Sequence, residues 1–184
     1  PIRVPGEDLE GVLGGINFLY DVKTNPSVTI GRRVAVVGGG NTAMDACRSA
    51  RRLGAEQVSV LYRRSREEMP ADSIEIEEAT EEGVNFIYLA APKAIEGNGK
   101  VERIICERMQ LGEPDASGRR SPVPTGETFV LEVDTVIAAV GQGIDFSTVP
   151  AELHDGRKMK VGKDYDTPLP GVFVCGDQQT GPKI

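Results

Sequence analysis

The chain has 184 residues, 39% of them hydrophobic, and a formal net charge of −7. That is enough apolar material to bury the core of one domain, or of two, whereas the acidic balance argues against nucleic acid as a partner, because neutralising phosphates requires a basic face. The three cysteines are widely spaced and form no C-x-x-C pair, which excludes a disulfide framework, a thioredoxin-like redox pair and a self-contained zinc or iron–sulfur site.

The first segment is expected to contain one helix and no strand. Residues 1–14 are polar and loop-like at first, and apolar side chains at helical spacing then predict a helix over Val12 to Val22. A cluster of turn-forming residues, Thr24 to Ser27, ends this helix and leads into the next element.

A strand–helix–strand unit follows. Val34 to Val37 is a short apolar run, typical of a strand that is buried on both faces. Three glycines come next, and Thr42 to Leu53 is expected to form a helix with small side chains on one face, ending at Gly54. Gln57 to Tyr62 is the second strand. This order is typical of half of a Rossmann-type nucleotide-binding fold.

The glycine turn predicts a site for the phosphates of a dinucleotide. Gly38, Gly40 and Ala43 match the pattern G-x-G-x-x-G/A, which combines a tight turn, close approach of the backbone to a pyrophosphate and close helix–strand packing. Free N–H groups at the helix start then bind the phosphates. The alternative is a purely structural turn, and Thr42 to Asp45 also fits a capping box that uses some of the same N–H groups. The residues assigned to this site are Gly38, Gly39, Gly40, Asn41, Thr42 and Ala43.

The end of the second strand favours NADPH over NADH. An NAD site has Asp or Glu about 20 residues after the glycine motif. Here that window contains Arg63, Arg64 and Arg66, with no acid before Glu67. Guanidinium groups suit a 2′-phosphate, which they bind bidentately. The alternative is a solvated basic turn that pairs with Glu67 and Glu68.

Other charged residues nearby are expected to have no binding role. Arg48, Arg51 and Arg52 lie toward the C-terminal half of the predicted helix, where cations complement the helix dipole. The predicted helix from Ser73 to Glu82 carries five glutamates, which we interpret as a solvated face.

The remaining elements complete an α/β fold. Asn98-Gly99 predicts a β-hairpin turn, and the polar segment from Gly112 to Gly126 predicts a mobile loop or hairpin tip. The expected strands are Val84 to Ala90, Lys93 to Glu96, Lys100 to Met109, Thr128 to Val133, Asp134 to Val140 and Gly171 to Cys175. The fold class is therefore a Rossmann-like three-layer α/β domain with a parallel sheet and an inserted antiparallel β-hairpin.

The sequence predicts no catalytic side chain. His154 is the only histidine, and we interpret it as an exposed residue of a polar loop rather than as part of a Ser/His/Asp or Cys/His nucleophile arrangement. No apolar run is long enough to span a bilayer and no signal peptide is visible, so we expect no membrane partner and a reducing, cytoplasmic location.

Five sequence blocks, in order, resemble the two-dinucleotide-domain flavoprotein oxidoreductases, and most closely the NADPH-dependent small (beta) subunit of glutamate synthase. The blocks are Val4 to Leu9, Val36 to Asp45, Tyr62 to Pro70, Thr135 to Gln142 and Pro170 to Pro182. The first FAD-binding glycine loop of that family is absent, and so are the N-terminal cysteines that ligate iron–sulfur clusters in glutamate synthase small subunits. Ile144-Asp145 also replaces the proline often found after the G-Q pair.

The resemblance implies an NADPH domain inserted into an FAD domain. Residues 14–143 would be the NADPH-binding domain, and residues 1–13 and 144–184 remnants of the flanking FAD-binding domain. The glycine turn would bind the pyrophosphate, and the other implied cofactor-binding residues are Arg63 and Arg64 at the 2′-phosphate, Gly141 and Gln142 near the nicotinamide half, and Gly176 and Asp177 at the FAD.

The function that the resemblance implies is presentation of NADPH for hydride transfer to FAD in a larger parent oxidoreductase. The partners would be the FAD domain of the same parent chain and a large glutamate synthase-type subunit or an iron–sulfur electron acceptor. The isolated chain is expected to bind NADPH without turnover. Two alternatives remain: a non-redox nucleotide-binding module, and another superfamily member of the dihydropyrimidine dehydrogenase or ferredoxin reductase type.

Overall fold

The computed structural model describes residues 1–114, 120–141, 145–156, 158–176 and 178. The chain divides into two compact units, Pro1–Val140 and Gly141–Ile184. Each unit is described by itself.

The first unit is built on a five-stranded sheet in which every pair of neighbours is parallel, in the order β1-β8-β2-β3-β4. Its strands are β1 (Val12–Gly14), β2 (Arg33–Val37), β3 (Gln57–Tyr62), β4 (Asn85–Tyr88) and β8 (Thr135–Ala138). The crossover helix between β2 and β3 makes the predicted βαβ unit, which is confirmed.

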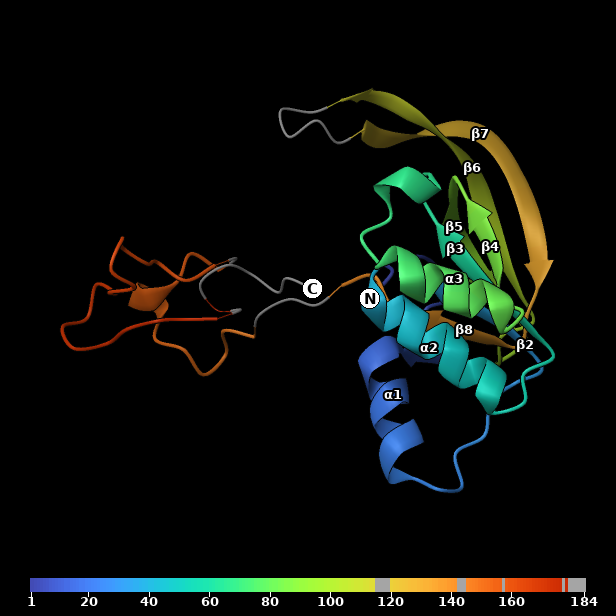
Figure 1. Cartoon of the computed structure of the whole chain (residues 1–184), viewed down its shortest axis with the longest axis horizontal. Helices are drawn as coiled ribbons and strands as arrows, with labels where there is room; N and C mark the ends of the chain where they lie inside the picture. Colours follow the sequence, from blue (N-terminus) through green and yellow to red (C-terminus); the bar gives the residue numbers. More distant parts are fainter. Residues whose placement is uncertain (115–119, 142–144, 157, 177, 179–184) are drawn as a thin grey trace. The chain divides into compact units, whose positions relative to one another are not determined.

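Three helices cover one face of this sheet: α1 (Gly15–Thr24), α2 (Asn41–Arg52) and α3 (Ser73–Glu81) (Figure 1). The side chains of β2 alternate between two cores. Val34 and Val36 are buried with Ala43 and Met44 of α2, whereas Ala35 and Val37 are buried with residues of a second sheet. A strand buried on both faces reads as a continuous apolar run, as the sequence predicted.

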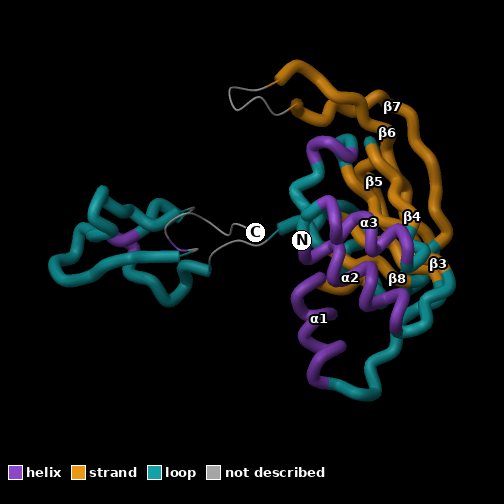
Figure 2. The backbone as a smooth tube through the Cα atoms, viewed as in Figure 1, coloured by secondary structure: helices purple, strands orange, loops and turns teal. Residues whose placement is uncertain are grey.

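The second sheet is antiparallel and has the order β5-β6-β7, with β5 at Ala90–Glu96, β6 at Arg103–Pro114 and β7 at Arg120–Glu132. It covers the face of the parallel sheet that the helices leave open, through a core that includes Ile95 and Ile104. The domain therefore has the predicted three layers: helices, parallel sheet and antiparallel sheet (Figure 2).

The predicted hairpin at Asn98-Gly99 is confirmed, because Glu96 pairs with Arg103 across it. Of these two residues only Gly99 has the expected positive φ, +78°. Residues 112–126 were predicted to be a mobile loop or a hairpin tip, and the structure places 112–114 and 120–126 in the paired ends of β6 and β7. β6 continues to Pro114 and β7 begins at Arg120, so this polar stretch is largely strand, and residues 115–119 lie outside the described part. A two-stranded ribbon with both faces exposed needs no apolar residues, and the sequence therefore lacks the usual alternation.

Two further expectations near the sheet need correction. Residues 12–14 form strand β1, which pairs with β8, and the helix begins only at Gly15. A short apolar run fits a strand as well as a helix, so its period does not decide between them. The predicted strand over 84–90 is divided, because Leu89 adopts a φ of +53° and Ala90 begins β5 in the other sheet.

The second unit contains little regular structure. It has a short 3-10 helix, Ala151–Leu153, and a small buried cluster of Leu153, Met159 and Val174. The buried strand predicted over 171–175 is not formed: Phe173 makes only an isolated bridge with Asp166 and is 67% exposed. Among the described residues, no helix has the length and apolar character needed to cross a membrane.

Candidate nucleotide-binding site

The turn between β2 and α2 requires glycine at two adjacent positions. Gly38 has a φ of +148°, and a Cβ there would lie 2.2 Å from the carbonyl oxygen of Ala139. A Cβ at Gly39 would lie 2.5 Å from the ring of Tyr62. Both distances are far below van der Waals contact. These glycines therefore allow the chain to turn tightly between two neighbouring strands and enter the helix.

The first turn of α2 offers free backbone donors. Gly40 is the N-cap residue, in extended conformation and with no side-chain cap. Its carbonyl oxygen accepts from the N–H groups of Ala43 and Met44 at 2.9 and 3.3 Å. The N–H groups of Gly40, Asn41 and Thr42 have no acceptor in the described chain. Three free donors at the positive end of a helix dipole form a favourable environment for a phosphate.

The capping box expected at Thr42 to Asp45 is not formed, because the helix begins one residue before Thr42 and Gly40 takes the N-cap position. No side chain therefore competes with an anion for the free N–H groups. Ala43 is completely buried against the sheet, in keeping with the packing role predicted for the third position of the motif.

The arginine turn, residues 63–68, follows β3 at the same edge of the sheet. β2 and β3 pair in parallel with Val37 opposite Leu61, so the glycine turn and the arginine turn leave adjacent strands at their carboxyl ends. In open α/β sheets this edge is where ligands bind. The structure thus brings the two predicted halves of the site to one edge.

Within this turn the two predicted arginines have different environments. Arg63 is exposed and has no hydrogen bond or ion pair in the described chain. Arg64 is partly buried: its Nε donates to the carbonyl oxygen of Arg120 at 2.8 Å, and its own carbonyl oxygen accepts from the N–H of Leu89 at 3.1 Å. Arg63 is therefore the guanidinium that is free for a ligand, and Arg64 is anchored to the second sheet.

The acids of the arginine turn do not neutralise Arg63. The side chain of Glu68 accepts from the N–H of Ser65 at 3.2 Å, and the Ser65 hydroxyl donates to Glu67. This hydrogen bond from Ser65 is the main cause of a lowered pKa of Glu67. The ion pairing that the alternative of a solvated basic turn assumed is therefore not formed by Arg63 in the described chain.

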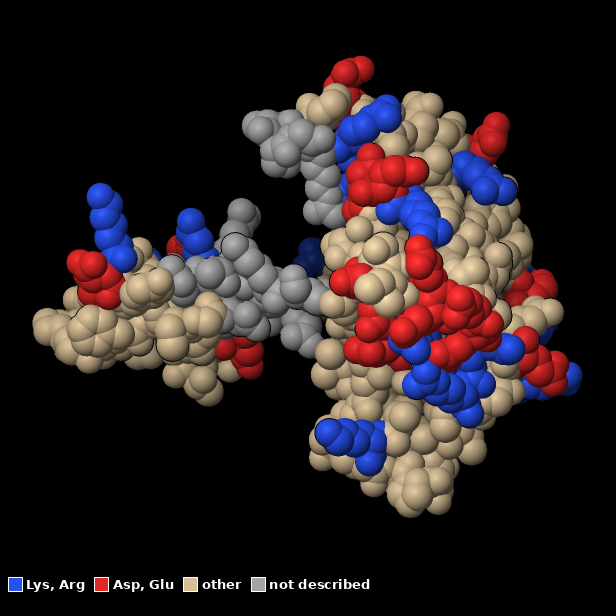
Figure 3. All heavy atoms as spheres, in the orientation of Figure 1, with Lys and Arg blue, Asp and Glu red and all other residues tan. Residues whose placement is uncertain are grey.

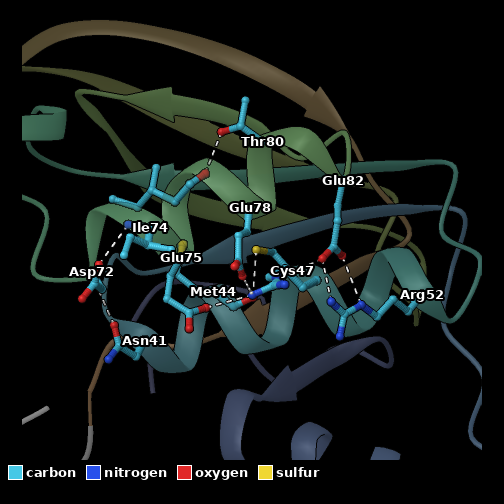
Figure 4. Close-up of polar contacts among 12 residues, drawn as sticks. Asn41, Met44, Cys47, Arg52, Asp72, Ile74, Glu75, Glu78, Thr80 and Glu82 are labelled. Carbon is cyan, nitrogen blue, oxygen red and sulfur yellow. Dashed lines mark hydrogen bonds and ion pairs between the residues drawn. The ribbon is translucent and has the colours of Figure 1, made fainter.

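Hydrogen bonds connect the glycine turn to the segment that follows the arginine turn. The N–H of Ala71 donates to the carbonyl oxygen of Gly39 at 3.0 Å, and the N–H of Asp72 donates to Asn41 Oδ1 at 3.2 Å (Figure 4). Asp72 in turn caps α3 by accepting from the N–H of Ile74. The side-chain oxygen of Asn41 thus accepts a hydrogen bond from the protein backbone, a contact that the sequence pattern did not indicate.

The arginines of α2 pair with the acidic helix. Arg48 Nη1 lies 3.0 Å from Glu75 and 2.7 Å from Glu78, and its Nε lies 2.8 Å from Glu82. Figure 3 shows acidic side chains gathered over α3 beside basic ones. The interpretation of α3 as a merely solvated face is therefore wrong for these three glutamates, which hold α3 to α2. A hydrogen bond from Arg52, and then one from Arg48, lower the pKa of Glu82.

The remaining predicted site residues belong to the second unit. Gly141 and Gly176 are exposed and have positive φ angles of +100° and +67°. Gln142 and Asp177 lie outside the described residues. In the described part of the chain, no group of three or more His, Cys, Asp or Glu side chains is arranged to hold a metal ion. Burial raises the pKa of the Cys47 thiol to about 12, which makes it a poor nucleophile.

Residues 1–184 match the model of the pyridine nucleotide-disulphide oxidoreductase family. The chain belongs to this family. The resemblance to glutamate synthase small subunits is confirmed: the chain is 37% identical over 200 residues to the putative glutamate synthase [NADPH] small chain of Cereibacter sphaeroides, with 100% of this chain and 48% of the relative covered.

A second relative is the NADPH-Fe(3+) oxidoreductase subunit beta of Geobacter sulfurreducens, which is 43% identical over 213 residues, with 99% of this chain and 32% of the relative covered. The chain thus spans less than half of the length of these curated relatives. The fold is similar to that of Mycobacterium tuberculosis FprA in complex with NADPH, with a TM-score of 0.81 and 22% identity over 100% of this chain and 56% of that one.

Proposed function

We propose that the first unit binds NADPH, with the pyrophosphate at the start of α2 and the 2′-phosphate at the arginine turn. The observation that carries the proposal is the pairing of three unbonded N–H groups, those of Gly40, Asn41 and Thr42, with the unpaired guanidinium of Arg63 at the same sheet edge. Backbone donors suit the pyrophosphate, whose charge is common to all dinucleotides. The guanidinium of Arg63 binds the 2′-phosphate, which NADPH has and NADH lacks.

NADPH as the ligand is also supported by the names of relatives, since both the Geobacter sulfurreducens and the Cereibacter sphaeroides proteins are named for NADPH. The absence of an acid at the end of β3 agrees with this choice, because a carboxylate there would repel a 2′-phosphate. The positive charge of Arg64 also attracts the 2′-phosphate, at longer range, and the hydrogen bond to the Arg120 carbonyl oxygen holds that charge in place.

In the parent protein, we propose, the chain presents NADPH to FAD, and the bound nucleotide supplies a hydride. The chain's own residues bind and orient the nucleotide, and none is required as an acid or base. Residues 14–143 form the NADPH-binding domain in this proposal, with 1–13 and 144–184 joined to an FAD domain. Gly141 and Gln142 are proposed near the nicotinamide, and Gly176 and Asp177 near the FAD. The partner is the FAD domain of the same parent, with a large glutamate synthase-type subunit or iron–sulfur acceptor beyond it.

The test is calorimetric titration of the chain with NADPH and with NADH, in wild type and in Arg63→Ala/Arg64→Ala. Removing a charge-assisted phosphate contact is expected to weaken NADPH binding about ten- to a hundredfold, to the level of NADH, and to leave NADH binding unchanged. Equal affinity of the wild type for both nucleotides, or binding of neither, would contradict the proposal.

A matched control removes the same charge elsewhere. Arg32 and Arg103 are exposed, and each is paired with one glutamate, Glu56 and Glu96 respectively. The variant Arg32→Ala/Arg103→Ala therefore has the same net charge as the test variant but leaves the arginine turn intact. It is expected to retain the preference for NADPH. Loss of that preference in the control would mean that overall charge, rather than a site, decides the affinity.

A further inference from the structure

Tyr62 contacts both halves of the proposed site. It is the last residue of β3, only 6% of it is exposed, and its ring lies directly against Gly39 of the glycine turn. Its hydroxyl donates to the carbonyl oxygen of Glu68 at 2.7 Å. Glu68 ends the 3-10 helix Arg66–Glu68, which closes the arginine turn. One side chain therefore connects the floor of the pyrophosphate site to the far end of the arginine turn.

The arginine turn is held at its two ends by the same neighbour. At its beginning, the Tyr62 ring packs on Gly39, and beyond its end the N–H of Ala71 donates to the Gly39 carbonyl oxygen. Between these points, Ser65 and the Glu68 side chain form a capping box, the Tyr62 hydroxyl joins Glu68 to the end of β3, and Arg64 bonds to Leu89 and Arg120. Without the hydroxyl, residues 63–68 keep the hydrogen bonds of Arg64 but lose the direct attachment of Glu68 to Tyr62.

We propose that Tyr62 is a positioning residue for recognition of the 2′-phosphate. This inference rests on the proposed NADPH site. Arg63 follows Tyr62 directly, and its exposed side chain has no partner that fixes it. The position of the guanidinium therefore depends on the backbone conformation of the turn. A turn fixed before binding reduces the conformational entropy that NADPH binding must overcome. NADH, which lacks the 2′-phosphate, gains nothing from the order of the arginine turn.

The test variant is Tyr62→Phe, which keeps the ring on Gly39 and removes only the hydroxyl. Titration with both nucleotides is expected to show NADPH affinity lowered about three- to tenfold, as for the loss of one hydrogen bond, and NADH affinity unchanged. The control is Tyr20→Phe, because Tyr20 is 66% exposed on α1 and its hydroxyl has no partner in the described chain. The control is expected to match the wild type for both nucleotides.

A double variant separates positioning from general support of the fold. In the Arg63→Ala/Arg64→Ala background, Tyr62→Phe is expected to cause no further loss of NADPH affinity, because neither guanidinium is left to position. Equal losses for NADPH and NADH would identify Tyr62 as a structural support and overturn the inference. Undiminished NADPH preference in Tyr62→Phe would also overturn it.

Two more outcomes are decisive. A Tyr62→Phe chain that fails to fold, judged by its thermal unfolding, contradicts the inference, because a hydroxyl that acts only on the arginine turn is not needed to form the sheet. A wild-type chain with no preference for NADPH overturns the proposed function itself, and the inference with it. A wild type that discriminates and a Tyr62→Phe variant that discriminates equally overturn the inference alone.

Discussion

The glycine turn and the arginine turn lie on adjacent strands, yet they are built in opposite ways. The three glycines of the glycine turn have no side chains, and the path of the turn is fixed by backbone and ring atoms that approach Gly38 and Gly39 closely. The arginine turn contains side chains of which Arg63 is exposed and unpaired, and it is held by a few hydrogen bonds. One is constrained by packing and the other by polar contacts.

The difference separates the part of the proposed site that would bind any dinucleotide from the part that would select NADPH. A pyrophosphate is common to all dinucleotides, so rigid backbone donors can bind it regardless of cofactor type. The choice between NADPH and NADH depends on side chains at the surface, which can change without disturbing the core. Substitutions in the glycine turn should therefore affect folding and all binding, whereas those in the arginine turn should affect only selectivity.

The largest effect is expected for Gly38→Ala. The added Cβ would overlap the Ala139 carbonyl at 2.2 Å, and the φ of +148° disfavours any side chain. We expect the free energy of unfolding to fall by about 2–4 kcal/mol and binding of both nucleotides to be lost. Urea denaturation and calorimetry measure these changes. Gly54→Ala is the control: its φ is +99° but nothing lies within 4 Å, so only backbone strain of about 1 kcal/mol applies.

A smaller and selective effect is expected for the single arginine variants. Arg63→Ala should weaken NADPH binding about tenfold, because an unpaired guanidinium is removed. Arg64→Ala should weaken it about threefold, since Arg64 Nε is already bonded to the Arg120 carbonyl oxygen. Neither variant should change NADH binding. An Arg64→Ala loss as large as that of Arg63→Ala would contradict the distinction between the free and the anchored arginine.

An effect on stability alone, with none on binding, is expected for the cluster that joins α2 to α3. Arg48→Met keeps the apolar stem but removes the partner of Glu75, Glu78 and Glu82, and should lower the free energy of unfolding by about 1–2 kcal/mol at pH 7. The control Arg52→Met removes a more exposed partner of Glu82 alone and should cost less. Nucleotide selectivity should remain in both, because neither side chain reaches the arginine turn.

The pH dependence of that cluster follows from the lowered pKa of Glu82, which Arg52 and then Arg48 cause. A carboxylate whose pKa is lower in the folded state stabilises fully above the pKa of free glutamate, about 4.3. That stabilisation is lost as the pH falls through the lower folded value. The difference in stability between the wild type and Arg48→Met should therefore shrink below about pH 4. A difference that is constant between pH 7 and pH 3 would contradict an ionic role.

Sequence patterns predicted the parts of the fold that depend on local rules. The run Val34 to Val37 predicted a buried strand, the glycines after it a tight turn, and the alanines of the next helix a face packed on the sheet, and the structure confirms all three elements. The hairpin at Asn98-Gly99 follows equally from the positive φ that Gly99 adopts. At each of these places, residue type alone determines the backbone.

Features that depend on distant neighbours were not predictable. Strand β1 exists because Val12 pairs with Val136, more than a hundred residues away along the chain. The exposure of Phe173 depends on what covers it rather than on its own apolar character. Within the candidate site, the motif identified Arg63 and Arg64 together, but only the fold separates them, because Arg64 meets a carbonyl of β7. Tyr62 was assigned to a strand, with no sign that its hydroxyl reaches Glu68.

The most direct test of the central claim is a crystal structure of the chain with NADP⁺. We predict the pyrophosphate oxygens within hydrogen-bond distance of the N–H groups of Gly40, Asn41 and Thr42, and the 2′-phosphate against the guanidinium of Arg63. The path of the glycine turn should be unchanged from the unbound chain. A nucleotide bound away from the start of α2, or one whose 2′-phosphate contacts no residue of the arginine turn, would contradict the account.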